Sequence, residues 1–145
     1  KFYGLPGLRL GFGFIGKGEE MERFAKYANM YLGDDRLSEE VGIAALKSGD
    51  HYREIARVMQ EARDMYKAEV GALDGFKVYR SVANFILIRY PIGLKEKLQK
   101  TFGDEDYKVK FMNEPDRNAH MRITLGRSEQ NRTVCDTILR IAKEQ

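Results

Sequence analysis

The sequence predicts an α/β protein whose larger, C-terminal part is an α+β domain: a small mixed or antiparallel sheet covered by helices. Two observations predict it. Apolar residues recur every three or four positions over residues 50–73 and again after residue 128, as on one face of a helix. Between these segments lie short apolar runs of strand length, and the longest is Phe85-Ile86-Leu87-Ile88.

Composition excludes several classes of protein. The 145 residues are 43% hydrophobic and 32% charged, unlike collagen-like, coiled-coil or disordered chains. No stretch approaches the ~20 apolar residues of a membrane span, and a net charge of +3 is too small to indicate nucleic-acid binding. The single cysteine, Cys135, excludes an internal disulfide and is typical of the reducing cytoplasm. Since there is neither a signal peptide nor an initiator Met, we expect a piece of a longer cytoplasmic protein.

The first third is predicted to hold a glycine-rich strand at residues 8–15 and helices at 19–32 and 37–47. Gly11-Phe12-Gly13-Phe14-Ile15-Gly16 matches the dinucleotide pattern G-x-G-x-x-G. It lies inside the strand, however, and not between a strand and a helix, so dinucleotide binding is not expected.

A long helix over residues 50–73 follows, with Asp50 as its cap. The remaining apolar patterns predict strands and helices in alternation, and Ser128 is the expected cap of the last helix. The expected strands cover residues 76–80, 84–90, 107–112 and 120–125, and the expected helices cover 93–102 and 128 to the C-terminus.

The first eleven residues carry a specific motif. Lys1-Phe2-Tyr3-Gly4-Leu5-Pro6-Gly7-Leu8-Arg9-Leu10-Gly11 resembles, in register, the lysine segment of fold-type I pyridoxal-phosphate enzymes. By that resemblance Lys1 would form the internal aldimine with the cofactor and later move a proton at the substrate Cα. Arg9 would hold the cofactor phosphate, since a planar, permanently charged donor fork suits an anion. Without the match of these eleven positions to the family motif, Lys1 would be interpreted as a solvated terminal lysine.

A second motif lies near the other end, at His120-Met121-Arg122-Ile123-Thr124-Leu125-Gly126 with Glu129 and Asn131 beyond. It resembles the family strand Leu-Arg-Ile-Thr-x-Gly-x-x-x-Glu-x-Asn, whose arginine receives an anionic group of the substrate. Strand alternation sends Arg122 to the face opposite its apolar neighbours, where it needs an anionic partner. Substrate binding and a structural salt bridge are both open, and the lysine segment favours substrate binding.

The middle segment, from Ser81 to Leu87, is similar to the Pro-Ser-x-Ala-Asn-Phe-x-Leu strand of the histidinol-phosphate aminotransferase branch, with Arg80 in place of the proline. The chain departs from that branch at Lys110, where an arginine is usual, and a lysine is the poorer bidentate donor. Arg127 follows Gly126 where a threonine is common, and residues 29–33 lack the aromatic-rich asparagine turn of the family. These three departures weaken the histidinol-phosphate assignment more than the aminotransferase assignment.

The resemblance implies the C-terminal part of a cytoplasmic, homodimeric aminotransferase of amino-acid biosynthesis. It would use pyridoxal 5′-phosphate to move an amino group between an amino acid or amino phosphate ester and a 2-oxo acid. The fragment alone is expected to be inactive, because the ring-stacking aromatic and the acid on the pyridine nitrogen would precede it. Two alternatives are a decarboxylase of the threonine-phosphate type and a non-catalytic small domain without cofactor. No metal site is expected, since two histidines and one cysteine lack ligand spacing.

The same resemblance divides the chain into residues 1–33, the end of the cofactor-binding large domain, and residues 34–145, a small domain with a long connecting helix. Residues 1–16 need a partner sheet for their apolar side chains. In this chain we expect them to be disordered or paired with another copy.

Overall fold

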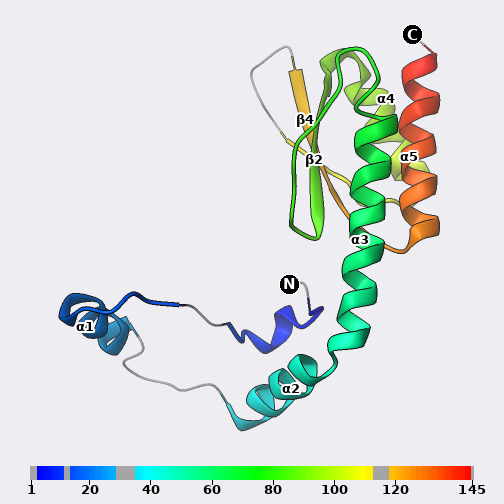
Figure 1. Ribbon diagram of the computed structural model, residues 1–145. Helices are drawn as coiled ribbons and strands as arrows, with labels where there is room; N and C mark the ends of the chain where they lie inside the picture. Colours follow the sequence, from blue (N-terminus) through cyan, green and yellow to red (C-terminus); the bar gives the residue numbers. More distant parts are fainter. Residues whose placement is uncertain (1–2, 12–13, 29–34, 113–117, 145) are drawn as a thin grey trace. The chain divides into compact units, whose positions relative to one another are not determined.

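The computed structural model describes residues 3–11, 14–28, 35–112 and 118–144 (Figure 1). Their contacts group the chain into two compact units, Lys1–Tyr52 (unit 1) and Arg53–Gln145 (unit 2). The division falls inside helix α3 (Gly49–Glu69). The expected domain boundary after residue 33 stays a prediction, since a contact division within one chain does not test an origin in a larger one.

Unit 1 contains a 3₁₀ turn, η1 (Pro6–Leu8), and the helices α1 (Glu19–Ala28) and α2 (Arg36–Lys47). Helix α2 begins one residue before its expected start. The extended backbone of Asp35 places its carboxylate where Oδ1 accepts the Ser38 N–H at 2.9 Å. This is the N-cap arrangement that favours Asp at such positions. Hydrogen bonds to its carboxylate from the Ser38 hydroxyl, at 2.5 Å, and from the Ser38 N–H lower the pKa of Asp35.

The strand expected at residues 8–15 is wrong for the described part of that segment. Leu8 ends η1, and residues 9–11 and 14–15 have no regular structure, while 12–13 lie outside the described residues. A strand needs a hydrogen-bonded neighbour, and none of the described residues of unit 1 supplies one. The helix expected over 19–32 is confirmed to Ala28, and residues 29–32 lie outside the description.

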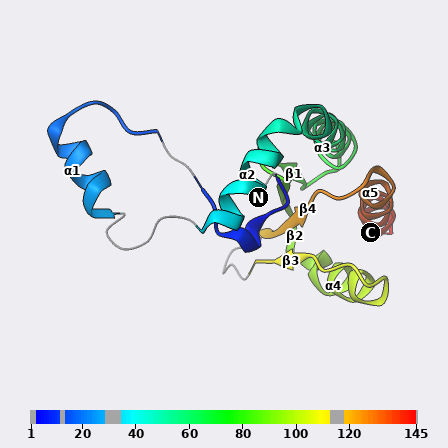
Figure 2. The same cartoon turned by 90° about the horizontal axis from the view of Figure 1, so that it is seen from below.

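Unit 2 is built on one antiparallel sheet with strand order β1-β2-β4-β3. Helices α3, α4 and α5 all lie against the same face of it, as Figures 1 and 2 show. The predicted α+β arrangement is confirmed, and the sheet is wholly antiparallel. The strands are β1 (Lys77–Val78), β2 (Phe85–Pro91), β3 (Lys110–Phe111) and β4 (Asn118–Thr124); the later helices are η2 (Ile92–Leu94), α4 (Lys95–Asp104) and α5 (Ser128–Lys143).

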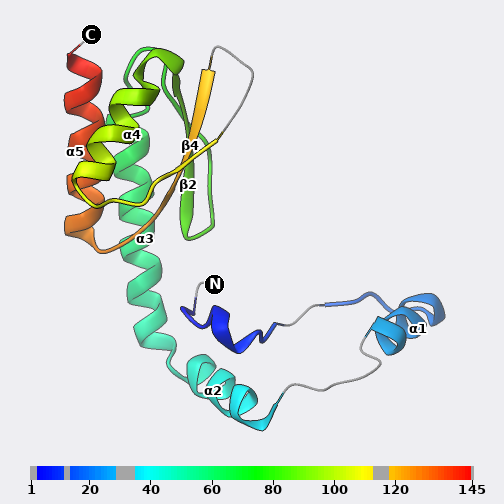
Figure 3. The ribbon, with the colours of Figure 1, turned by 180° about the vertical axis from the view of Figure 1, so that it is seen from behind.

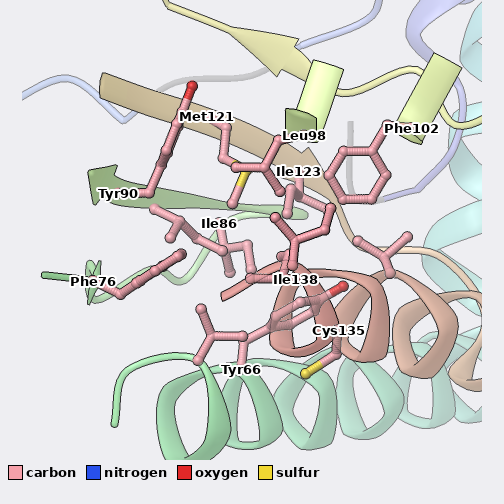
Figure 4. Packing of buried hydrophobic residues seen from close by; sticks show 14 of the residues in the cluster. Tyr66, Phe76, Ile86, Tyr90, Leu98, Phe102, Met121, Ile123, Cys135 and Ile138 are labelled. Carbon is pink, nitrogen blue, oxygen red and sulfur yellow. The ribbon is translucent and has the colours of Figure 1, made fainter. Parts of the chain in front are cut away.

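The core of unit 2 lies between the sheet and these helices (Figure 4). Alternate residues of β2, namely Ile86, Ile88 and Tyr90, are each at most 1% exposed, whereas the residues between them are half-buried. From the helices, Tyr66, Leu98, Phe102, Cys135, Ile138 and Ile141 meet them. Because apolar side chains repeat every two residues on the strands and every three or four on the helices, one continuous core forms.

Several element ends differ from those expected. Helix α3 begins at Gly49, so Asp50 lies in its first turn and is not its cap. It ends at Glu69, four residues early, because a turn follows in which Gly75 has φ +74°. Ser128 is the first residue of α5, whose N-cap is Arg127; the side-chain oxygen of Gln130 accepts the Arg127 N–H at 3.1 Å.

Seen from behind, α5 lies alongside α4 and ends at the C-terminal end of the chain (Figure 3). Within the part of the chain that the structure describes, no helix combines the length and the apolar character that crossing a bilayer requires.

Candidate active site

Arg122 lies in the middle of β4, and the alternation of that strand decides which way it faces. Met121 is 0% and Ile123 4% exposed, both in the core. Arg122 is half-buried on the opposite face, away from α3, α4 and α5 (Figure 2), which we call the open face. The predicted orientation of Arg122 is therefore confirmed, and so is that of Thr124.

The neighbours of Arg122 are cationic and aromatic. In the strand register it stands opposite Leu87 of β2 and Lys110 of β3. Its guanidinium carbon lies 5.3 Å from the centroid of the Phe85 ring, within the range of a cation–π contact. Among the described residues no carboxylate forms an ion pair with Arg122. The structural salt-bridge alternative therefore has no partner among the described residues.

The turn after β4 is fixed by a buried side chain that the sequence analysis quoted only as part of a motif. Asn131, 3% exposed in the first turn of α5, accepts the Gly126 N–H at Oδ1 and donates from Nδ2 to the Gly126 carbonyl, both at 2.9 Å. The Tyr66 hydroxyl donates to the Asn131 carbonyl at 3.0 Å, and burial raises the pKa of Tyr66. These bonds tie the end of the arginine strand to α5 and α3.

Arg9 lies directly after η1 and is exposed. Its φ of 55° is in the left-handed region, uncommon for a residue with a side chain, and its N–H donates to the Pro6 carbonyl at 3.3 Å. Nη1 donates to the same carbonyl at 3.4 Å. Within the described chain no carboxylate pairs with it. Lys1 lies outside the described residues.

Unit 1 also contains a hollow of about 700 Å³ between η1 and α2, lined by apolar side chains such as Leu8, Leu10, Ile43 and Leu46. Arg9 is not among its lining residues. This hollow therefore supplies no cationic group for the cofactor phosphate.

The described residues contain neither a cluster of metal ligands nor an exposed thiol. Among the described residues no group of His, Cys, Asp and Glu side chains could hold a metal ion. Cys135 is 0% exposed in α5, and burial raises the pKa of its thiol to about 11. A neutral, enclosed thiol is a poor nucleophile, and the predicted role of Cys135 as a small core residue is confirmed.

The chain is similar in sequence to aminotransferases. The family model for aminotransferase class I and II matches residues 1–138. Proteins called histidinol-phosphate aminotransferase are 29% identical over 94% of this chain in Clostridium botulinum (strain Hall) and 29% identical over 97% in Hydrogenovibrio crunogenus. The chain spans about two-fifths of the length of these relatives, 39% and 40%.

Solved structures give the same fold. The crystal structure of the histidinol-phosphate aminotransferase from Clostridium acetobutylicum superposes on 100% of this chain and 44% of its own, with a TM-score of 0.74 at 21% identity. A decarboxylase from Sulfurospirillum multivorans covers 83% of this chain, with a TM-score of 0.61 at 16% identity. At such identities these structures show the fold alone. The family match over residues 1–138 goes further: the chain belongs to the class I and II aminotransferases.

Proposed function

We propose that the intact protein transfers an amino group between an amino acid or amino phosphate ester and a 2-oxo acid, as aminotransferases of the histidinol-phosphate type do. One observation carries this proposal. Arg122 stands half-buried on the open face of the sheet, beside Lys110, and none of the described carboxylates pairs with it. A buried or half-buried cation without a counterion is costly, and a substrate carboxylate or phosphate would supply one.

The family depends on pyridoxal phosphate, and the residues present fit that group. Arg9 is exposed and unpaired among the described residues, so its planar donor fork is available for a phosphate. Lys1 has the primary amine that an aldehyde requires. When bound, this cofactor supplies an electron sink that makes the substrate Cα–H acidic.

Residues of this chain bind the substrate, move the proton and retain the cofactor. Arg122 binds the anionic end of the substrate and fixes its orientation, with Phe85 against the guanidinium and Asn131 holding the following turn. The Lys1 amine accepts the proton from Cα and returns it during transfer. Arg9 retains the cofactor by its phosphate. A homodimer is expected for the intact protein, and sedimentation at equilibrium measures it.

The experiment that tests this proposal replaces Arg122 by Gln in the intact protein. Loss of a charge-assisted bond should raise the KM for the amino donor and lower kcat/KM by roughly ten- to a hundredfold. Cofactor content, measured by absorbance, should not change. The matched control is Lys100→Gln, which removes an exposed cation of α4 and should leave both constants alone.

Product analysis separates the two kinds of chemistry. Transfer produces a new amino acid from the 2-oxo acid without release of carbon dioxide. If carbon dioxide is released from the substrate in step with its consumption, the protein is a decarboxylase of the threonine-phosphate type. Unchanged kcat/KM in Arg122→Gln for every amino donor tested would remove Arg122 from the substrate site.

A further inference from the structure

A second basic cluster lies on the open face of the sheet, one row away from Arg122. Lys77 of β1 is in register with Arg89 of β2, and Arg89 is in register with His120 of β4. His120 precedes Arg122 by two residues, which places it about 7 Å along the same strand face. The three side chains therefore form a row across three strands, which we name the basic row.

Tyr79 adds a hydroxyl to this row. It continues the pairing of β1 with β2, since its N–H donates to the Leu87 carbonyl at 3.0 Å. Its hydroxyl lies 3.1 Å from Nε2 of His120, two strands away. The Lys77 ammonium lies 5.0 Å from the centroid of the Tyr79 ring, a cation–π contact. Tyr79 thus bridges β2 and connects both ends of the basic row.

The row is unfavourable in the absence of an anion. Like charges directly opposite each other on neighbouring strands destabilise a sheet, and Lys77 with Arg89 is such a pair. Strands β1 to β4 contain no Asp or Glu, and no described carboxylate pairs with Lys77 or Arg89. The Arg89 Nε is buried without a hydrogen-bond partner among the described atoms. Burying such a donor costs free energy unless something accepts from it.

We propose that the basic row is an anion subsite for a phosphate group, separate from the substrate arginine. An ammonium, a guanidinium, an imidazole and a phenol spread over three strands offer more donors than the two oxygens of a carboxylate accept. A phosphate ester presents three strong acceptor oxygens and a charge of about −1.5 to −2 at pH 7. The subsite goes beyond the proposed function, because it uses neither Arg122 nor the cofactor residues.

The test is a titration of the ¹⁵N-labelled 145-residue chain with inorganic phosphate at pH 7, followed by NMR. Ionic strength is held constant with sodium chloride, so that screening alone produces no change. We expect saturable shifts at Lys77, Tyr79, Arg89 and His120. Methyl phosphate separates a phosphate ester from free phosphate as the ligand, and malonate tests whether a dicarboxylate competes equally.

Three variants decide the outcome. Arg89→Gln should raise the dissociation constant for phosphate by roughly tenfold or more. Lys77→Gln, an exposed change on an edge strand, should weaken binding without a risk to the core. Lys100→Gln on α4 should have no effect. Each variant's melting temperature is compared with that of the parent chain to confirm that it folds.

The result that would overturn the subsite is non-saturable shifts, or shifts of equal size in the parent and in Arg89→Gln. Malonate binding as tightly as phosphate would also contradict the choice of phosphate. Arg122→Gln separates this inference from the proposed function. It should leave the phosphate titration of the basic row unchanged, and a site lost only in Arg122→Gln would refute the row while supporting Arg122.

Discussion

The two units of this chain differ in how far they bury their apolar side chains. Among the residues that the structure describes, all eighteen buried hydrophobic ones belong to unit 2, and Val82 and Ile92 are the only large apolar side chains of that unit that are exposed. In the described part of unit 1 the one buried residue is Ser38, while Phe14 is 95%, Leu37 71% and Phe24 65% exposed. A sheet with helices packed on one face encloses a hydrophobic core, whereas the short segments η1, α1 and α2 enclose none. The proposed chemistry is divided along the same line, with Lys1 and Arg9 in unit 1 and Arg122 in unit 2.

The largest expected effect comes from the core of unit 2. Ile138→Ala on α5 removes a side chain that is 0% exposed and should lower the free energy of unfolding by about 2–5 kcal/mol. The matching substitution in unit 1, Leu37→Ala, should change the free energy of unfolding by less than about 0.5 kcal/mol, since Leu37 is 71% exposed. Urea denaturation followed by circular dichroism measures both. Equal losses would mean that unit 1 has a core of its own.

A smaller loss of unfolding free energy is expected when the hydrogen bonds between Asn131 and Gly126 in unit 2 are removed. Asn131→Ala leaves the Gly126 N–H and carbonyl without their partners and should cost about 1–3 kcal/mol. Asp35→Ala removes the cap of α2 in unit 1 and should leave the unfolding transition of unit 2 unchanged. An Asn131→Ala variant with the same melting temperature as the parent chain would contradict the stabilising role of these hydrogen bonds.

The smallest effect concerns pH. The bidentate ion pair of Glu69 on α3 with Arg132 on α5, at 2.7 Å for each oxygen, lowers the pKa of Glu69 through hydrogen bonds from Arg132. Because the folded-state pKa lies below the unfolded one, this pair stabilises unit 2 above the unfolded pKa and is lost as pH falls through the folded value. Glu69→Gln should remove that part of the acid sensitivity. Melting temperatures from pH 7 down to 3 test it, and parallel curves for both proteins would contradict it.

Sequence patterns predicted much of unit 2 because its periodicities are strong. Alternation placed Met121 and Ile123 inward and Arg122 outward, and both sides are confirmed. Patterns could not give the strand order β1-β2-β4-β3, which brings Lys110 beside Arg122 and Arg89 beside His120. Register depends on which strands meet, and that is a property of the whole sheet.

The sequence patterns predicted the wrong N-cap residue for two helices, because neighbouring residues can each occupy that position. Ser128 and Asp50 are good cap residues, yet Ser128 is the first residue inside α5 and Asp50 the second residue inside α3. Element ends are the least determined part of such a prediction. The strand at residues 8–15 failed for another reason, because a strand depends on a neighbour that no local pattern contains. The Gly126–Asn131 link was missed, although an asparagine in the first turn of a helix was a usable signal.

The most direct measurement on the proposed chemistry is borohydride reduction of the intact protein with pyridoxal phosphate, followed by peptide mass mapping. We expect the pyridoxyl mass on the peptide that contains Lys1, its loss in Lys1→Arg, and its retention in the control Lys17→Arg. A protein that carries no label at Lys1, or carries it equally on other lysines, would contradict the assignment of Lys1 and with it the proposed amino transfer.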